Sequence, residues 1–139
     1  AFINYGHIDA EITDFTVSDS DGTIVDQTAL ELRNAPEQTV TVGVDYFLPL
    51  SFGEFSVHYN YRWRDEYHTI LNNNPKGLVE SAGFHNASVD LNFLENYRVS
   101  IYGRNIGDER YARVVDIGIS SWGSYNSPEQ YGIEFTVDF

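Results

Sequence analysis

Apolar and polar residues alternate with a period of two along most of this chain, as they do in strands with two different faces. The clearest segment spans residues 54–65, where Phe55, Val57, Tyr59 and two further aromatic residues alternate with polar or charged side chains. The same pattern predicts strands over residues 39–48, 86–93, 97–104 and 131–139, and a weaker one over residues 2–12. No amphipathic helix of convincing length is expected.

The connections between these six segments alternate between short and long. The short ones are residues 49–53 and 94–96, and the long ones are residues 13–38, 66–85 and 105–130. Structureless loops of this length argue against a compact soluble domain. They are typical of outer-membrane barrels, which have short periplasmic turns and long extracellular loops. We therefore expect an all-β fold, an antiparallel transmembrane β-barrel segment of about six strands.

Aromatic residues on the apolar phase of these strands agree with this topology. They cluster near both strand ends, with mainly Val, Ile, Leu and Ala between them. Aromatic girdles of this kind mark the two lipid–water boundaries of a membrane barrel. The girdle residues are Tyr46, Phe55, Phe93 and Tyr97 at the expected periplasmic end, and Tyr61 and Trp63 at the extracellular end.

A soluble β-sandwich or barrel is the alternative, since its strands also alternate. Phe55, Val57 and Tyr59 would then be core residues. The asymmetry of the loops and the two aromatic girdles favour the membrane interpretation.

The amino-acid composition excludes several kinds of partner and site. The chain has 8 basic and 21 acidic residues, a net charge of −13, which argues against nucleic acid or an anionic membrane surface as partner. It contains no Cys, so disulfides and thiolate sites are excluded. It also lacks Met and starts without a signal-peptide pattern, so we expect a processed product or a piece of a longer protein. No apolar run is long enough for a transmembrane helix.

Several motifs, in this order and spacing, resemble the C-terminal portion of TonB-dependent outer-membrane receptors. The most specific is the segment 103–111, similar to the family pattern Gly-x-Asn-Leu-x-Asp-x-x-Tyr with Ile106 at the Leu position. The others are residues 34–37, 62–67 and 127–132, the last running into the terminal strand.

This resemblance implies the last strands and extracellular loops of a barrel of about 22 strands that encloses a plug domain. It implies a receptor in the Gram-negative outer membrane for active uptake of a ferric siderophore, a corrinoid or an oligosaccharide, driven by the TonB system through the plug. The plug and the earlier strands are absent from this sequence. We expect neither an enzyme nor a cofactor. The alternatives are a small oligomerising outer-membrane β-protein, structural or adhesive, and a soluble carbohydrate-binding β-domain.

The last strand also resembles the signal recognised by the barrel assembly machinery, which would bind it by β-augmentation. Its alternation alone would fit any last barrel strand. The signal residues are Tyr131, Ile133, Phe135, Val137 and Phe139.

Candidate site residues lie on the polar phase and in the long loops. On the polar phase they would face the barrel lumen and contact plug or substrate, or form structural ion pairs. These lumen candidates are His58, Arg62, Arg64, Glu66, Tyr102, Arg104 and Glu134. Loop residues Asp116, Trp122 and Tyr125 would contact substrate or pack loop against loop. No set of His or acidic residues has a metal-binding spacing, and no catalytic arrangement is expected.

Overall fold

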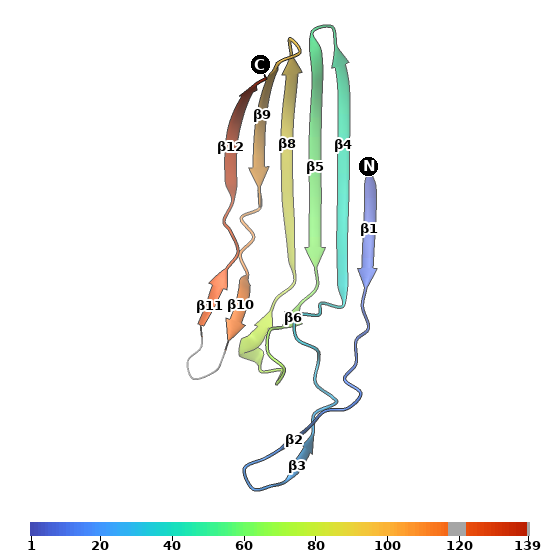
Figure 1. Cartoon of the computed structure of the whole chain (residues 1–139), viewed down its shortest axis with the longest axis vertical. Helices are drawn as coiled ribbons and strands as arrows, with labels where there is room; N and C mark the ends of the chain where they lie inside the picture. Colours follow the sequence, from blue (N-terminus) through green and yellow to red (C-terminus); the bar gives the residue numbers. More distant parts are fainter. Residues whose placement is uncertain (117–121, 139) are drawn as a thin grey trace.

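The computed structural model describes residues 1–116 and 122–138 and is built around one antiparallel sheet of six strands. The chain adds these strands one after another, so neighbours in the sheet are consecutive long strands (Figure 1). Their order is β1 (Phe2–His7), β4 (Gln38–Leu50), β5 (Gly53–Arg64), β8 (Ala82–Phe93), β9 (Tyr97–Arg104) and β12 (Gln130–Val137). The expectation of an all-β fold with six antiparallel strands is confirmed.

Short and long connections lie at opposite ends of the sheet (Figure 1). The β4–β5 and β8–β9 turns and the C-terminus lie at one end, called here the turn end. At the other, the loop end, each long connection forms its own small hairpin, which the sequence did not predict. These hairpins are β2 (Thr16–Ser18) with β3 (Ile24–Asp26), β6 (Tyr67–His68) with β7 (Leu78–Val79), and β10 (Ala112–Asp116) with β11 (Trp122–Tyr125). A 3₁₀ turn, η1 (Pro75–Gly77), precedes β7.

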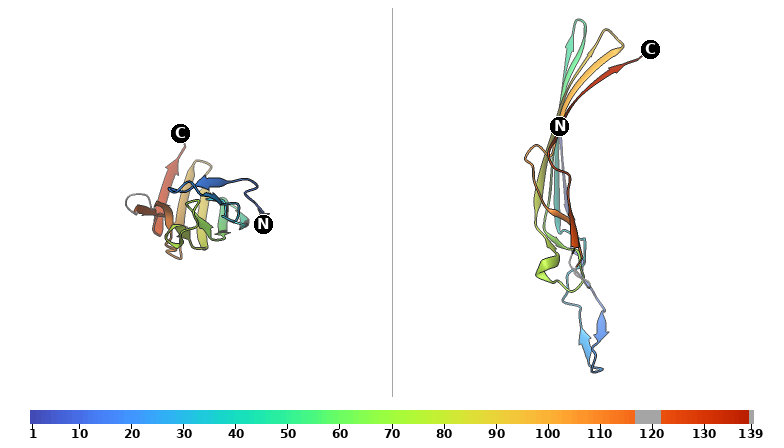
Figure 2. Two further views of the ribbon diagram at one scale, coloured as in Figure 1. Left: turned by 90° about the horizontal axis from the view of Figure 1, so that it is seen from below. Right: turned by 90° about the vertical axis from the view of Figure 1, so that its left-hand side faces the viewer.

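Seen edge-on, the sheet is a single curved layer with no second layer against it (Figure 2). One side, the apolar face, carries the aliphatic and aromatic residues of each strand, and the opposite side, the polar face, carries the polar ones. In the described residues the buried hydrophobic side chains are Val79 and Ala82. Both lie beside the β6–β7 hairpin at the loop end, so the long sheet has no hydrophobic core of its own.

Large apolar side chains of the apolar face are exposed instead. Ile133 is 76% exposed, Ile3 74% and Phe135 60%. A soluble sheet protein buries one face against another layer. The arrangement within this chain is therefore not that of a β-sandwich.

The first strand differs from its expected form. It ends at His7 rather than Ile12. Its pairing with β4 puts Ile3 opposite Val42 and Phe2 opposite Gly43, so Ile3 belongs to the apolar face and Phe2 to the polar one. The Phe2 ring lies where a Cβ on residue 43 would be, so Gly43 makes room for it. The phase of β1 is thus set by its partner strand.

The sheet is open, with β1 at one edge and β12 at the other. Among the described residues, each edge strand is paired on one side only, which leaves a row of its main-chain N–H and C=O groups without a strand partner. No helix among residues 1–116 and 122–138 is both long and apolar enough to cross a membrane.

Candidate functional site

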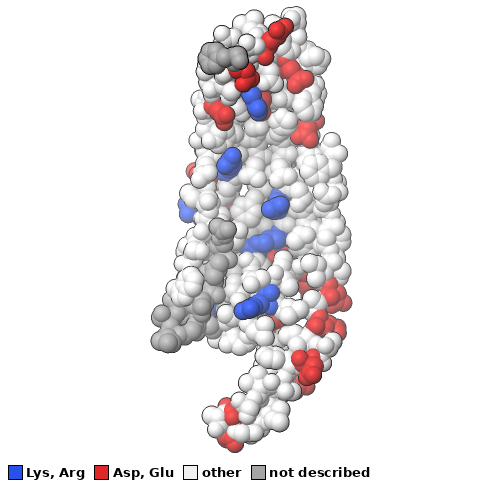
Figure 3. Space-filling view, viewed as in Figure 1, with Lys and Arg blue, Asp and Glu red and all other residues white. Residues whose placement is uncertain are grey.

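The candidate site is the polar face, because it gathers nearly all the charged side chains of the sheet. Figure 3 looks onto this face: basic side chains follow the middle of the sheet, and acidic ones gather at the two ends and along one edge. Strand register explains the clustering, since residues directly opposite one another share a face. Asp45 lies opposite His58, which lies opposite Ser88, and Asp90 lies opposite Ser100.

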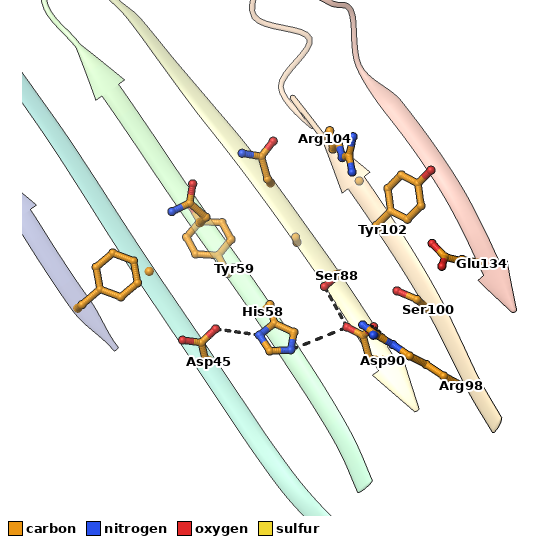
Figure 4. A pocket seen from close by; sticks show the side chains of 16 residues that line it. Asp45, His58, Tyr59, Ser88, Asp90, Arg98, Ser100, Tyr102, Arg104 and Glu134 are labelled. Atoms are coloured by element: carbon orange, nitrogen blue, oxygen red, sulfur yellow. Dashed lines mark hydrogen bonds and ion pairs between the residues drawn. The ribbon is translucent and has the colours of Figure 1, made fainter. Parts of the chain in front are cut away.

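Five side chains of the polar face form a network across β4, β5, β8 and β9 (Figure 4): Asp45, His58, Ser88, Asp90 and Arg98. His58 Nδ1 lies 2.8 Å from Asp45 Oδ1, and His58 Nε2 lies 3.9 Å from Asp90 Oδ2. Arg98 donates two hydrogen bonds to Asp90 Oδ1, from Nε at 3.1 Å and from Nη2 at 2.6 Å. Ser88 Oγ donates to Asp90 Oδ2 at 3.1 Å.

Asp90 is the centre of this network and the most buried charged residue of the sheet, with 2% of its surface exposed. A buried carboxylate requires counter-charge and hydrogen-bond donors, and Arg98 and Ser88 supply both. The network therefore ties four neighbouring strands together on the polar side. Sequence reasoning selected His58 but missed Asp45, Asp90 and Arg98. Their polar phase was a signal, but their pairing depends on strand register.

Beside the network the polar face is hollowed. A cavity of about 420 Å³ lies over β5, β8 and β9, and His58, Asp90, Tyr102, Arg104 and Glu134 are among its lining residues. Four of the sequence-predicted residues, His58, Tyr102, Arg104 and Glu134, thus come together at one place (Figure 4). Arg104 lies over the ring of Tyr102, with its guanidinium carbon 5.2 Å from the ring centre.

A second cavity of about 300 Å³ adjoins the first towards the loop end and is lined by Arg62, Arg64, Phe84, Tyr111 and the shared residues Asn60 and Asn86. Arg64 is clamped here between two rings, 4.7 Å from the centre of Tyr67 and 4.3 Å from that of Tyr111. Its Nη1 donates to the main-chain oxygens of Asp65 and Glu80. Arg64 therefore fixes the loop segments against the sheet.

Glu66 lines neither of these two cavities. It follows the end of β5 and is exposed. It lines a separate hollow of about 200 Å³ with Asp9, Glu31 and Glu37. The structure thus separates Glu66 from the other six lumen candidates.

The segment 103–111, which carries the family resemblance, joins the end of β9 to the residues before β12 through hydrogen bonds. Asn105, 7% exposed and with a positive φ of 51°, lies at its centre. Its side-chain amide donates to the carbonyls of Glu109 and Ser127 at 3.0 and 3.1 Å, and its oxygen accepts from the Glu109 N–H at 3.0 Å. Asp108 accepts hydrogen bonds from the Glu129 N–H and from Arg110. Tyr111, the last residue of the motif, donates its N–H to Asn126.

Hydrogen bonding also sets the ionisation of Asp108. The Glu129 N–H, followed by the Arg110 side chain, lowers the pKa of the Asp108 carboxyl below its ordinary value. Asp108 is thus held as a charged acceptor that fastens the residues between β9 and β10 to the residues before β12.

The predicted girdle residues share the apolar face and fall into two groups. Phe93 stacks on Tyr97 at 5.5 Å, and Tyr97 stacks on Phe135 at 6.1 Å, towards the turn end. Towards the loop end, His85 lies 4.6 Å from the ring of Tyr61 and 2.7 Å from the hydroxyl of Tyr59. The remaining girdle residues are Tyr46 and Phe55 near the turn end and Trp63 at the loop end.

The predicted assembly strand, β12, is one of the two open edges of the sheet. Tyr131, Ile133, Phe135 and Val137 alternate along β12 on the apolar face, whereas Phe139 lies outside the described residues. In the loops, Trp122 and Tyr125 are 58% and 71% exposed on β11. They are three positions apart, so their side chains point to opposite sides of the strand. Asp116 pairs with Trp122 through the main chain, and its side chain lies outside the described part.

No group of three or more His, Cys, Asp or Glu side chains that could hold a metal ion occurs in the described part of the chain. Comparison with protein-family models, curated proteins and solved structures gave no match for this chain. The case for function therefore rests on the sheet itself and on the sequence motifs.

Proposed function

We propose that this chain forms the last strands and extracellular loops of a TonB-dependent receptor barrel in the Gram-negative outer membrane. The observation that carries the proposal is the single open sheet with one exposed apolar face and one charged, hollowed face. The motifs at residues 34–37, 62–67, 103–111 and 127–132, which resemble that family, support the same proposal.

Lipid is the partner that suits the apolar face. Moving a large aliphatic or aromatic side chain out of water contributes about 1.5–3 kcal/mol, and Ile3, Tyr5, Ile133 and Phe135 are each at least 60% exposed within this chain. The two groups of aromatic rings would then lie at the two lipid–water boundaries. This orientation puts the turn end in the periplasm and the loop end outside the cell.

Earlier strands of the same receptor suit the two edges. An unpaired edge in hydrocarbon costs several kcal/mol for each unsatisfied main-chain group. Barrel closure through further strands removes that cost, and β12 would first pair with the barrel assembly machinery. The polar face then faces the lumen and the plug.

The receptor would take up a nutrient too large for porins: a ferric siderophore, a corrinoid or an oligosaccharide. Energy would come from the TonB system acting on the plug, outside this chain. This segment would contribute lumen wall and loops, with Trp122 and Tyr125 exposed to incoming substrate.

The mass of the native polypeptide tests the proposal. An antibody raised against this chain is used to detect the heat-denatured protein in the outer-membrane fraction. A band several times the 15.8 kDa of this chain is expected. A band near 15.8 kDa would contradict a single-chain receptor and favour a barrel closed by several copies. Recovery in the soluble fraction would contradict a membrane protein altogether.

A further inference from the structure

The arginines of the polar face divide into a paired and an unpaired group. Arg98, towards the turn end, is bound to Asp90. Arg62, Arg64 and Arg104, towards the loop end, have no carboxylate within ion-pair distance among the described residues. With 21 acidic and 8 basic residues, the chain has more than enough carboxylates to pair with every arginine. The charge on this face is instead segregated along the strands.

The unpaired arginines surround one continuous hollow. Its cavities of about 300 and 420 Å³ share Asn60 and Asn86 as lining residues. Arg62 lines the first and Arg104 the second. Volumes of this size, with aromatic walls and a few convergent polar groups, are typical of small-ligand sites. The aromatic walls are Phe84, Tyr111 and Tyr102.

The three arginines have different parts in this hollow. Arg64 is fixed between Tyr67 and Tyr111 and donates to main-chain oxygens. Among the described residues, Arg62 is exposed and has no hydrogen-bond partner, and Arg104 lies over the ring of Tyr102 without a hydrogen-bond or ion-pair partner. Two guanidiniums are therefore free to bind a ligand, while the third holds the loop segments that bound the site.

We propose that this groove binds a small anionic ligand whose carboxylate or phosphate groups are held by Arg62 and Arg104. The proposal rests on the proposed function and narrows the substrate to an anionic class. Guanidinium suits these groups because it offers planar, two-pronged hydrogen bonding. Asp45 and Glu134 line the larger cavity, and their carboxylates would repel the ligand from that half of the groove and keep it at the loop end. The positive charge of Arg62 and Arg104 would thus decide which ligand binds here, although the net charge of the chain is −13.

Calorimetric titration of the native polypeptide in neutral detergent, at low salt, tests this site. The probes are citrate, inorganic phosphate and the neutral sugar maltotriose, so that carboxylate, phosphate and uncharged binding are separated. Arg62→Gln and Arg104→Gln are expected to weaken binding of the preferred anion roughly ten- to a hundredfold, the value of one charge-assisted hydrogen bond. Arg110→Gln is the matched control, because Arg110 is paired with Asp108 outside the groove.

Chemical modification gives a second readout that needs no variant. Phenylglyoxal labels exposed guanidiniums, and bound anion should protect Arg62 and Arg104 but not Arg110. Equal binding of maltotriose and the anions, or equal labelling with and without anion, would overturn the proposal. These outcomes leave the mass of the native polypeptide unchanged, so failure here is distinguishable from failure of the receptor proposal.

Discussion

Replacing Arg98 with alanine should destabilise the protein more than replacing its partner Asp90, although Arg98 is the more exposed residue. The Arg98 side chain is 55% exposed and that of Asp90 only 3%. Arg98→Ala leaves a desolvated carboxylate without its counter-charge. Asp90→Ala leaves a guanidinium that water can solvate. The larger cost therefore follows from the residue left behind.

The magnitudes follow from the contacts. Two charge-assisted hydrogen bonds join the pair, at 3.1 and 2.6 Å. Leaving a buried charge unpaired costs about 3–5 kcal/mol. Because His58 and Ser88 remain near Asp90, we expect the lower end of that range, about 3 kcal/mol, for Arg98→Ala. Asp90→Ala should cost about 1–2 kcal/mol, and the double variant about the same as Asp90→Ala alone.

Urea unfolding of the native polypeptide in phospholipid vesicles, followed by tryptophan fluorescence, gives these free energies of unfolding. Arg110→Ala is the control, since its pair with Asp108 is 52% and 44% exposed and should contribute less than about 1 kcal/mol. If Arg98→Ala were no more destabilising than Arg110→Ala, Asp90 would not be desolvated, and the reasoning would be refuted.

Three further predictions follow from the turns and loops. Gly53→Ala should destabilise by about 1–3 kcal/mol in the same assay, because a Cβ there would overlap the Asn92 main-chain oxygen, whereas Gly107→Ala, with 4.0 Å of clearance, should be neutral. Asn105→Ala should lower the free energy of unfolding by about 2–4 kcal/mol, because three hydrogen bonds are lost and alanine is strained at a positive φ. Asn105→Gly should cost about 1 kcal/mol less, because glycine adopts this φ without strain. The lowered pKa of Asp108 stabilises the fold above its unfolded pKa of about 3.9, and this contribution disappears as pH falls through the folded value. The urea midpoint should therefore fall from pH 5 to pH 3 in the unaltered protein but less in Asp108→Asn.

The sequence predicted the sheet well because period-two alternation is a local signal. Residues 54–65 were expected as a strand, and β5 spans Gly53–Arg64. The prediction for residues 2–12 was wrong in the end of the strand and in which residues face the apolar side. The second error has a physical reason. Phe2, Ile3 and Tyr5 are all apolar, so the pattern alone does not decide which of them share a face, and Gly43 on β4 does.

The site was only partly predictable. His58 and Arg104 were found from their polar phase, but Asp90 and Arg98 meet diagonally across β8 and β9, since Arg98 lies opposite Asn92. Such a pair depends on register, which no single segment specifies. The hairpins of the long connections were missed because strands of two to five residues, such as β6 and β10, show too few repeats of the alternation.

Single-cysteine labelling along β5 tests the central claim most directly, because this chain contains no Cys and any Cys elsewhere in the native polypeptide is first replaced by Ser. Cysteines at Val57 and Tyr59 on the apolar face, and at Asn60 and Arg62 on the polar face, are labelled in the native polypeptide in vesicles. We predict that a fluorophore at residues 57 and 59 is quenched by brominated lipid, and that a fluorophore at residues 60 and 62 responds to a water-soluble quencher instead. The same response at all four positions, or lipid quenching on the polar face, would contradict a sheet that separates lipid from a polar lumen.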